Sequence, residues 1–543
     1  MDLRDFTFLT EELIAKEPKL GIPELNSGFV RHDELQSVNL LKSEQTAEGV
    51  KSDYEGDGLV PLLAKAELGK EGNYLVKVSM TADCDTDGYL FAGRRRMVMK
   101  KAFKAGERFT AEFAANVSPI VPRTYSEPME DTGLDIALAG RGMVLAGIEV
   151  RGFDGPTVYI AGDSTVTDQP AAYPYDPALS YSGWGQMLQY FLGSRMAVSN
   201  HAHSGLTTES MRSEGHYAIL FDRIKAGDYC LFQFAHNDQK LGHLKAFEGY
   251  TANLKRYIDE IKSKGATPVI VSPLARNTWK GDGTYNDLLE EYAEACRTIA
   301  QKENVPYIDL HAYSMDFVVR NGRETARRWY FPSDYTHTND YGAYMYAGFV
   351  YSRMCELGLV PGTAAEKING SRSEDFRSDW MPPAEPPVLK LPTAQNGGGE
   401  AAGKDFDDTK TGTAAKQINI DRPGDILTRA EAFELVIATV KFFPTNVYND
   451  MFIDVVGHEV YAGSIQCAWQ NGIIPASMLG DAEKRIYPEK PVTLAEFTDI
   501  LRLGYLSRRP AGKVIESLDT CGLAPDGPLT RKQAAYICGQ VSI

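Results

Sequence analysis

The fold is decided by the stretch Val158-Tyr159-Ile160-Ala161-Gly162-Asp163-Ser164-Thr165, where a short apolar run ends in small and polar residues. An apolar run without alternation is typical of a strand that is buried on both faces. Similar runs follow at Met196–Ser199, Tyr229–Phe234, Pro268–Ser272 and Val305–Leu310, and helical patterns lie at Leu244–Lys264, Tyr285–Lys302 and Asp340–Leu357. This alternation predicts a central α/β domain with a doubly wound parallel sheet.

Residues 25–150, before this domain, have the pattern of an antiparallel sheet. Segments rich in strand-forming residues are separated by Gly, Asp and Pro, and they lie at Tyr74–Met80, Gly88–Lys100, Arg108–Val117, Leu134–Leu138 and Met143–Val150. Short strands at such intervals predict an N-terminal antiparallel β-sandwich. Within it, we expect Arg94-Arg95-Arg96 to lie on a solvated strand edge.

The chain changes composition twice after residue 370. Residues 370–424 are rich in Pro, Gly, Lys and Asp, which is typical of a flexible linker. Beyond them, Thr428, Thr493 and Thr530 each stand three residues before Glu or Gln, at the start of an apolar helical pattern. This is the pattern of a helix capping box, and its recurrence predicts a small α-helical repeat module. We therefore expect a sandwich over residues 1–154, the α/β domain over 155–369, the linker over 370–424 and the helical module over 425–543.

The overall charge limits the possible partners. The 543 residues carry a net charge of −16, which argues against nucleic acid as a partner and against electrostatic docking on an anionic membrane. No stretch has the apolar length of a membrane span.

The seven cysteines are scattered and include no C-x-x-C pair, so they predict neither a zinc ribbon nor a disulfide framework. The charged N-terminus lacks the apolar core of a signal peptide, which predicts a cytoplasmic location; a secreted or cell-surface location stays open if a signal was removed.

Residues that could catalyse ester hydrolysis follow the predicted parallel strands. Ser164 comes directly after the first of them, at the strand end where open α/β sheets form their sites. A serine hydroxyl needs a base to take its proton, and His337 is our candidate. Asp334 lies three residues earlier in the same loop and could hold the imidazole in the correct tautomer. The three residues predict the catalytic triad of a serine esterase.

The same sheet edge offers donors for the oxyanion that forms when a serine attacks an ester. They are the backbone amides of Ser164 and of Gly205, which follows the second strand, and the side-chain amide of Asn237, which follows the third. A glycine lets its amide approach the substrate closely. We therefore predict that these three groups form an oxyanion hole.

Other polar residues near these strand ends are less specific candidates. We expect substrate contacts from Asp163, His236 and Arg276, where Arg276 could meet a substrate carboxylate or pair with an Asp or Glu, and His236 could orient Asn237. A metal bound by His201, His203, His236 and Asp238 is an alternative that we do not favour. The predicted reaction requires no cofactor.

The order of these motifs resembles the SGNH (GDSL-type) hydrolase superfamily and, within it, the rhamnogalacturonan acetylesterases. The segments that carry the resemblance are Ile160–Asp168, Gly183–Gln186, Phe234–Asp238 and Asp334–Thr338. The resemblance covers about residues 155–360 and implies a flavodoxin-like α/β fold with the triad and oxyanion hole named above. The family usually has a glycine where this chain has Ala235.

The flanking parts also resemble known modules. The predicted sandwich is similar to galactose-binding-like modules, which often act as packing partners in such esterases. The C-terminal part resembles S-layer homology repeats at Phe452–Val455, Ala468–Ile474 and Tyr487–Glu489. This second resemblance implies contact with a cell-wall polymer, although packing on the esterase or homodimerisation is also open.

Together, these features predict a serine esterase that removes O-acetyl groups from an acetylated plant polysaccharide or oligosaccharide. The resemblance favours rhamnogalacturonan, or pectin more broadly, with an acetyl-serine intermediate. One alternative is a GDSL esterase or lipase that acts on other acyl esters or on acetylxylan. Another is a carbohydrate-binding or surface-attachment protein with a vestigial hydrolase core.

Overall fold

The computed structural model describes residues 1–32, 39–56, 58–122, 125–279, 284–332, 334–363, 376–385, 424–440, 442, 452, 454–455, 461–478, 485–508, 518, 520 and 522–541. Most of the predicted linker, residues 370–424, lies outside the described residues. The contacts of the chain divide it into two compact units. The first comprises Met1–Asn277, Asp287–Phe331 and Thr336–Gln395, and the second comprises Thr278–Asn286, Pro332–Tyr335 and Asn396–Ile543.

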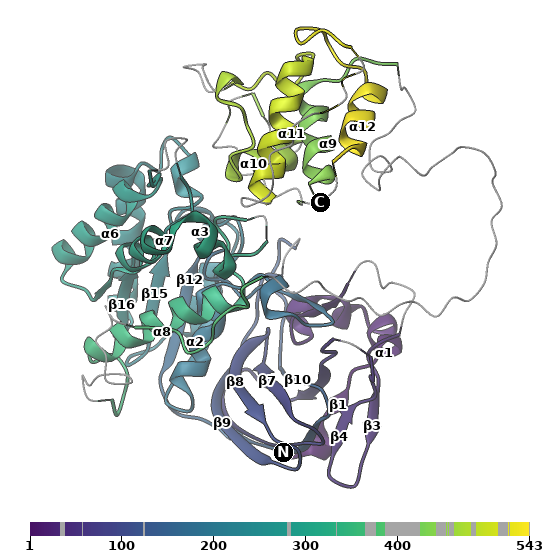
Figure 1. The fold of residues 1–543 in the computed structure, drawn as a ribbon. Coiled ribbons are helices and arrows are strands. Elements are labelled where there is room, and N and C mark those ends of the chain that lie inside the picture. The colour runs from purple at the N-terminus through teal and green to yellow at the C-terminus, as the bar shows by residue number, and fades with distance from the viewer. Residues whose placement is uncertain are drawn as a thin grey trace. The chain divides into compact units, whose positions relative to one another are not determined.

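The N-terminal part of the first unit consists of two five-stranded antiparallel sheets (Figure 1). One sheet has the order β1-β5-β10-β7-β8, and the other has the order β3-β4-β11-β6-β9. The strands are β1 (Thr7–Phe8), β3 (Ser43–Gln45), β4 (Val50–Ser52), β5 (Leu62–Glu67), β6 (Gly72–Ala82), β7 (Thr86–Ala92), β8 (Arg96–Phe103), β9 (Arg108–Val117), β10 (Gly133–Ala139) and β11 (Met143–Gly152). Side chains from both sheets, including Val78 of β6 and Leu90 of β7, form one buried cluster. The antiparallel structure predicted for this region is confirmed.

The segment Gly88–Lys100 was expected to be one strand, and this expectation is wrong. It is divided between β7 and β8 by a turn in which Gly93 has φ 55° and Arg95 has φ 58°. The expectation of a solvated edge is also wrong, because Arg95 is fully buried and Arg96 is 4% exposed. Their side chains form ion pairs with Asp340 and Asp168 of the α/β part, which withdraws the charges from water.

The α/β part contains a five-stranded parallel sheet with the order β14-β12-β15-β16-β17 (Figure 1). Its strands are β12 (Thr157–Gly162), β14 (Ala197–Asn200), β15 (Tyr229–Gln233), β16 (Thr267–Val271) and β17 (Tyr307–Ile308). The predicted parallel sheet is confirmed, although β17 is shorter than the expected Val305–Leu310. Because parallel strands end at one edge of the sheet, the residues after β12, β14 and β15 meet there.

Helices cover this sheet, and their order along the chain follows the predicted alternation. They are α2 (Trp184–Leu192), α3 (Ser210–Ser213), α4 (His216–Arg223), α5 (Thr251–Ser263), α6 (Glu290–Glu303), α7 (Leu310–Ala326) and α8 (Asp340–Glu356). Tyr159 and Ala161 of β12 join a buried cluster with residues of α4, α5 and α6. Val158 and Ile160 point to the opposite face and are also fully buried. The sheet is thus buried on both faces, as its apolar strands predict.

A short additional sheet joins the start of the chain to the α/β part. Its strand β13 (Ala171–Tyr173), a few residues after Ser164, pairs in parallel with β2 (Phe29–Arg31). The neighbouring helix α1 (Glu11–Lys16) contributes Glu11, which accepts a hydrogen bond from Tyr173 at 2.8 Å. The N-terminal residues therefore contact the segment that follows the candidate nucleophile.

Among its described residues, the second unit contains four α-helices, which are α9 (Arg429–Thr439), α10 (Ala462–Gln470), α11 (Leu494–Arg508) and α12 (Arg531–Gly539). The capping boxes that start with Thr428, Thr493 and Thr530 are confirmed, since each threonine exchanges hydrogen bonds with the Glu or Gln three residues later. Apolar residues of the four helices share one core. That these helices form sequence repeats stays a prediction.

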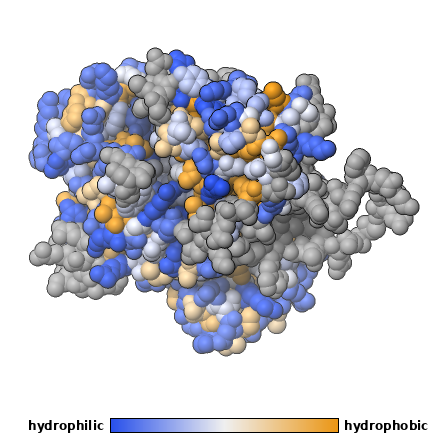
Figure 2. All heavy atoms as spheres, turned by 45° about the horizontal axis from the view of Figure 1, so that its top comes forward, coloured by the Kyte–Doolittle hydropathy of each residue, from blue (hydrophilic) through white to orange (hydrophobic). Residues whose placement is uncertain are grey.

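The described helices include none with the length and apolar character to cross a membrane. On the face shown in Figure 2, hydrophobic side chains lie in small groups among hydrophilic ones.

Candidate active site

Ser164 lies in a tight turn directly after β12. The turn is held by Asp163, whose Oδ1 accepts hydrogen bonds from the backbone N and the Oγ1 of Thr165 at 3.0 and 2.8 Å. Gly162, the last residue of β12, leaves no space for a side chain, because a Cβ there would lie 2.4 Å from the carbonyl oxygen of Gln233. The local sequence therefore fixes where the Ser164 hydroxyl points.

The Ser164 hydroxyl meets the imidazole of His337. Ser164 Oγ lies 2.8 Å from His337 Nε2, and each residue is 4% exposed. The distance is that of a hydrogen bond between a hydroxyl and a ring nitrogen. Sequence analysis predicted both residues, and the structure brings them together across 173 positions of the chain.

Backbone hydrogen bonds from two other segments hold the loop that carries His337. Its carbonyl oxygen accepts a hydrogen bond from Phe331 N at 3.0 Å, and the carbonyl of the next residue, Thr338, accepts one from Ser182 N at 3.0 Å. Asn339 then caps α8 by accepting from Gly342 N at 3.1 Å. The predicted third member, Asp334, is buried and lies three residues before His337, in the short segment 332–335 that groups with the second compact unit.

Asp163 and His236 form a buried pair beneath the turn. Asp163 Oδ2 lies 3.0 Å from His236 Nδ1, while His236 Nε2 lies 2.9 Å from the carbonyl oxygen of Leu274. Because a carbonyl oxygen only accepts, this Nε2 atom carries a proton. Burial opposes the charge of Asp163, but His236 and the Thr165 donors outweigh it and lower the pKa of the Asp163 carboxyl. His236 thus contacts Asp163 and the Leu274 carbonyl, and its predicted role in orienting Asn237 stays a prediction.

The two further donors predicted for the oxyanion hole lie after β14 and β15. Gly205 has φ 88°, and the space around the position of its missing Cβ is open to 4 Å. The Asn237 side chain is oriented by its neighbours, since its Nδ2 donates to Leu206 O at 2.9 Å and its Oδ1 accepts from Lys240 Nζ at 2.6 Å. An amide nitrogen has two hydrogens, so one N–H of Asn237 is not used by the Leu206 bond.

The neighbours of Asn237 carry two unusual features. Ala235 is buried and has φ 121°, a backbone conformation that favours glycine. Asp238 is fully buried, and its Oδ1 accepts from Thr208 N and Oγ1 at 2.9 and 2.6 Å. Burial raises the pKa of the Asp238 carboxyl to about 7.

The structure also shows where the remaining predicted residues lie. Arg276 is 3% exposed and its Nη2 donates to the backbone oxygen of His236 at 3.3 Å. His201 Nε2 lies 2.9 Å from Ser199 Oγ, and His203 Nδ1 lies 3.1 Å from Ser204 O. The described residues contain no group of three or more His, Cys, Asp or Glu side chains that could hold a metal ion.

Sequence reasoning missed two groups beside the site. Gln169 Nε2 donates to the Ser164 carbonyl oxygen at 3.2 Å, and Gln186 in turn bonds to the Gln169 backbone. Gln186 lies in the motif Gly183–Gln186, which belongs to the family resemblance but for which the sequence predicted no role.

The aromatic rings of Tyr181 and Phe331 stack with centroids 3.6 Å apart, and Tyr181 packs edge-on against His337 at 5.9 Å. No sequence signal marked this pair.

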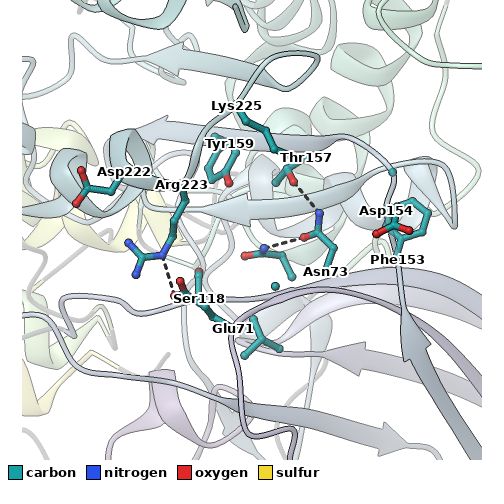
Figure 3. A pocket seen from close by; sticks show the side chains of 14 residues that line it. Glu71, Asn73, Ser118, Phe153, Asp154, Thr157, Tyr159, Asp222, Arg223 and Lys225 are labelled. Carbon is teal, nitrogen blue, oxygen red and sulfur yellow. Dashed lines mark hydrogen bonds and ion pairs between the residues drawn. The ribbon is translucent and has the colours of Figure 1, made fainter. Parts of the chain in front are cut away.

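A separate cavity of about 480 Å³ lies at the opposite end of β12, where Thr157 begins the strand (Figure 3). Its walls come from β6, β9, β12 and α4. Polar groups in it bond to each other: Arg223 pairs with Glu71 at 2.8 Å, and Asn73 donates to Thr157 at 2.7 Å. This cavity is distinct from the site around Ser164, which lies beyond the other end of the strand.

Residues 160–344 match the family described as GDSL-like Lipase/Acylhydrolase. The chain is also 34% identical over 215 residues to the rhamnogalacturonan acetylesterase RhgT of Bacillus subtilis (strain 168), an alignment that covers 37% of this chain and 90% of RhgT. The chain belongs to the GDSL-like lipase/acylhydrolase family. The resemblance predicted from the motifs is therefore confirmed for the α/β part, and this GDSL-family protein is a carboxylic ester hydrolase.

Two further relatives are similar to this GDSL-family protein over a similar share of its length. A probable rhamnogalacturonan acetylesterase of Bacillus subtilis, YesY, is 32% identical over 210 residues, covering 37% of this chain and 94% of YesY. A rhamnogalacturonan acetylesterase of Emericella nidulans is 28% identical over 225 residues, covering 37% of this chain and 85% of that enzyme.

Proposed function

We propose that this ester hydrolase removes O-acetyl groups from an acetylated plant polysaccharide, with rhamnogalacturonan as the favoured substrate. The 2.8 Å distance between Ser164 Oγ and His337 Nε2 carries the proposal, because it is the arrangement of a nucleophile and its general base. The choice of acetyl ester and of polysaccharide rests on the similarity to rhamnogalacturonan acetylesterases.

The reaction begins when Ser164 Oγ attacks the acetyl carbonyl and His337 Nε2 takes its proton. For this step Nε2 must accept, so the imidazole proton lies on Nδ1, where we assign Asp334 to hold it. The negative charge on the carbonyl oxygen is stabilised by the amides of Ser164 and Gly205 and by the free N–H of Asn237. The bonds of the Asn237 side chain to Leu206 and Lys240 support this assignment, because a side chain already held in place needs little rearrangement in the transition state.

The tetrahedral intermediate then breaks its bond to the sugar oxygen. The sugar hydroxyl leaves with the proton from His337, and the acetyl group stays on Ser164. A water molecule gives a proton to the same imidazole and attacks the acetyl-serine. Acetate leaves, the proton returns to Ser164, and no cofactor takes part.

The stacked pair Tyr181–Phe331 supports a saccharide as the leaving group. Both residues are partly exposed, and Tyr181 contacts the imidazole that would protonate the departing sugar oxygen. The C–H face of a pyranose ring packs well on an aromatic ring. We assign this pair to the binding of a sugar unit next to the acetylated one.

The net charge of −16 favours a second candidate, acetylated xylan. Rhamnogalacturonan carries galacturonate, and its negative charges are repelled by an acidic protein, whereas xylan is less charged. Added salt screens such repulsion, so kcat/KM on acetylated rhamnogalacturonan would rise with ionic strength.

The experiment that tests the proposed function measures acetate release from acetylated rhamnogalacturonan and acetylated xylan, and p-nitrophenol release from p-nitrophenyl acetate and p-nitrophenyl octanoate. We expect activity on an acetylated polysaccharide and preference for acetate over octanoate. Ser164→Ala and His337→Gln should each lower kcat by several powers of ten. Normal acetate release by Ser164→Ala would refute the mechanism, and preferred cleavage of octanoate would assign the enzyme to longer acyl esters.

A further inference from the structure

Arg95 is a residue of the antiparallel sheets that reaches into the α/β part. It lies in the turn between β7 and β8, is fully buried and has φ 58°. For a residue other than glycine, this backbone conformation is strained and persists only where the surroundings impose it. The contacts of the Arg95 side chain are therefore the feature that could impose this backbone conformation.

All five N–H groups of the Arg95 guanidinium have acceptors in the α/β part. Nη1 bonds to both carboxylate oxygens of Asp340, at 3.0 and 2.7 Å. Nη2 donates to Tyr181 O at 2.6 Å and to Gln186 Oε1 at 3.2 Å, and Nε donates to Gln169 O at 3.1 Å. The planar guanidinium of an arginine can donate hydrogen bonds to three chain segments at once. The compact ammonium of a lysine cannot reach all of them.

Two of these segments hold His337. Asp340 begins α8, three residues after His337, and accepts a further hydrogen bond from Tyr175 at 2.6 Å. Tyr181 forms a β-bridge with Asn339 and packs on the His337 ring. Arg95 therefore connects two chain segments beside the His337 imidazole, the segment of Tyr181 and the segment of Asp340.

The third segment holds Ser164. Gln169 receives the Arg95 bond on its carbonyl oxygen and donates through Nε2 to the carbonyl oxygen of Ser164 at 3.2 Å. Gln186 braces this contact, because its Nε2 donates to the same Gln169 carbonyl at 2.9 Å. A single side chain thus joins the segments of both members of the candidate nucleophile–base pair.

Stability alone is a weak reason for this arrangement. A buried ion pair loses the hydration of both charges, and apolar residues of the same volume often stabilise a fold as well or better. Burial raises the pKa of the Asp340 carboxyl even with Arg95 beside it, so the ion pair does not fully offset the cost of removing this charge from water. What the pair does provide is a fixed register between segments that are 245 residues apart.

We propose that Arg95 is a positioning residue for ester hydrolysis: it sets Ser164 and His337 at their reacting distance, so that the antiparallel sheets form part of the catalytic apparatus. The proposal rests on the proposed function of the Ser164–His337 pair. Arg95 itself does not touch the substrate. A shift of about 1 Å between reacting groups lowers a rate by about 100-fold, which sets the size of the expected effect.

The test compares variants of the full-length protein with p-nitrophenyl acetate, a substrate whose cleavage does not depend on the identity of the sugar. We expect Arg95→Met to lower kcat by about 100-fold with little change in KM, and Arg95→Lys to lower it less. The rate at which an organophosphonate labels Ser164 should fall in parallel, since it reports the activation of the hydroxyl. Asp340→Asn keeps the shape of the carboxylate and should reduce kcat in the same direction.

Lys65→Met is the matched control. Lys65 pairs with Asp135 at 3.0 Å inside the antiparallel sheets and is largely buried, and its other polar partners are Asp131 and the carbonyl oxygen of Leu25, both in the N-terminal part of the chain. Its loss should lower Tm and leave kcat unchanged. An equal fall of kcat in Lys65→Met would show that any weakening of the sheets reduces activity, and would overturn the proposal.

A chemical rescue separates positioning from packing. Arg95→Ala leaves a space that guanidinium ion can fill, so guanidinium at non-denaturing concentration should restore part of kcat, whereas urea at the same concentration should not. A folded Arg95→Met or Arg95→Ala with the kcat of the parent protein would refute the proposal. If Arg95→Met and Arg95→Ala both fail to fold, Asp340→Asn and Arg95→Lys provide the test. An unchanged kcat in these two variants would also refute the proposal.

The two proposals fail in different ways. If Ser164→Ala retains activity, the proposed function is wrong. If Ser164→Ala and His337→Gln are inactive while the Arg95 variants are fully active, the proposed function stands and only the positioning by Arg95 is wrong.

Discussion

Asp163 Oδ2 lies 3.0 Å from His236 Nδ1, and this contact joins the residue before Ser164 to the residue before Asn237. Both side chains are buried, so the pair links the turn of the candidate nucleophile to that of a candidate oxyanion donor beneath the surface of the site. The hydrogen bonds from His236 and Thr165 keep Asp163 ionised. We infer that this pair holds the two turns together.

The first prediction concerns Asp163→Asn. Asparagine loses one acceptor oxygen, and a buried group left without its hydrogen-bond partner costs about 1–3 kcal/mol, so we expect the free energy of unfolding to fall by that order in urea titrations at pH 7. The pKa of Asp163 is lowered in the folded state, so its contribution to stability is present above the ordinary pKa of 3.8 and is lost as the pH falls below it. The difference between the parent protein and the variant should therefore shrink below pH 3.8. A difference that stays constant down to pH 2 would contradict an ionised Asp163.

The second prediction concerns Ala235→Gly. Ala235 has φ 121°, where a Cβ causes strain. Relief of the strain should raise the free energy of unfolding by about 1 kcal/mol. Ala161→Gly is the control, because Ala161 is equally buried within β12 and loses about 0.5–1 kcal/mol as a strand residue. Thermal unfolding that shows equal losses for both variants would show that Ala235 is not strained.

The third prediction concerns the pH dependence of Asp238→Asn. Burial raises the pKa of Asp238 to about 7 from 3.8, so the folded protein resists its ionisation. Between these two values the folded state binds more protons than the unfolded state, and stability falls as the pH rises. Asparagine removes this penalty and keeps an acceptor for Thr208. The Tm of the variant relative to the parent should therefore increase from pH 4 to pH 7 and then level off.

The control for this prediction is Asp222→Asn, an exposed position on α4. Its Tm should differ little from that of the parent at pH 4 and at pH 8. If Asp238→Asn gives the same Tm difference at both pH values, the buried carboxyl does not titrate in this range.

The sequence alone predicted the elements whose formation depends on local pattern. The apolar strand before Ser164 and the three capping boxes need only neighbouring residues to specify them, and each forms as expected. The meeting of Ser164 and His337 could also be predicted, because parallel strands end at one edge of their sheet.

Other features depend on partners that are distant in the chain, and these could not be predicted. Arg95 looks like part of a solvated strand until Asp340 is placed beside it, 245 positions away. The contact of His236 Nδ1 with Asp163 Oδ2 likewise joins residues 73 positions apart, and the residues around His236 do not reveal it. A sequence pattern states which residues are polar, whereas the pairing of buried polar groups depends on the final packing of separate segments.

The last prediction concerns Tyr181→Leu. If the Tyr181–Phe331 pair binds a sugar unit, the loss of the aromatic face should raise KM for an acetylated oligosaccharide and leave KM and kcat for p-nitrophenyl acetate nearly unchanged. Leucine keeps the apolar contact but lacks the flat ring, and the backbone carbonyl that accepts from Arg95 is retained. Phe247→Leu, which alters an aromatic residue that is 55% exposed, controls for a general loss of surface aromatics. An equal loss on both substrates would assign Tyr181 to the placement of His337, because only that defect would reduce the cleavage of an ester without a sugar.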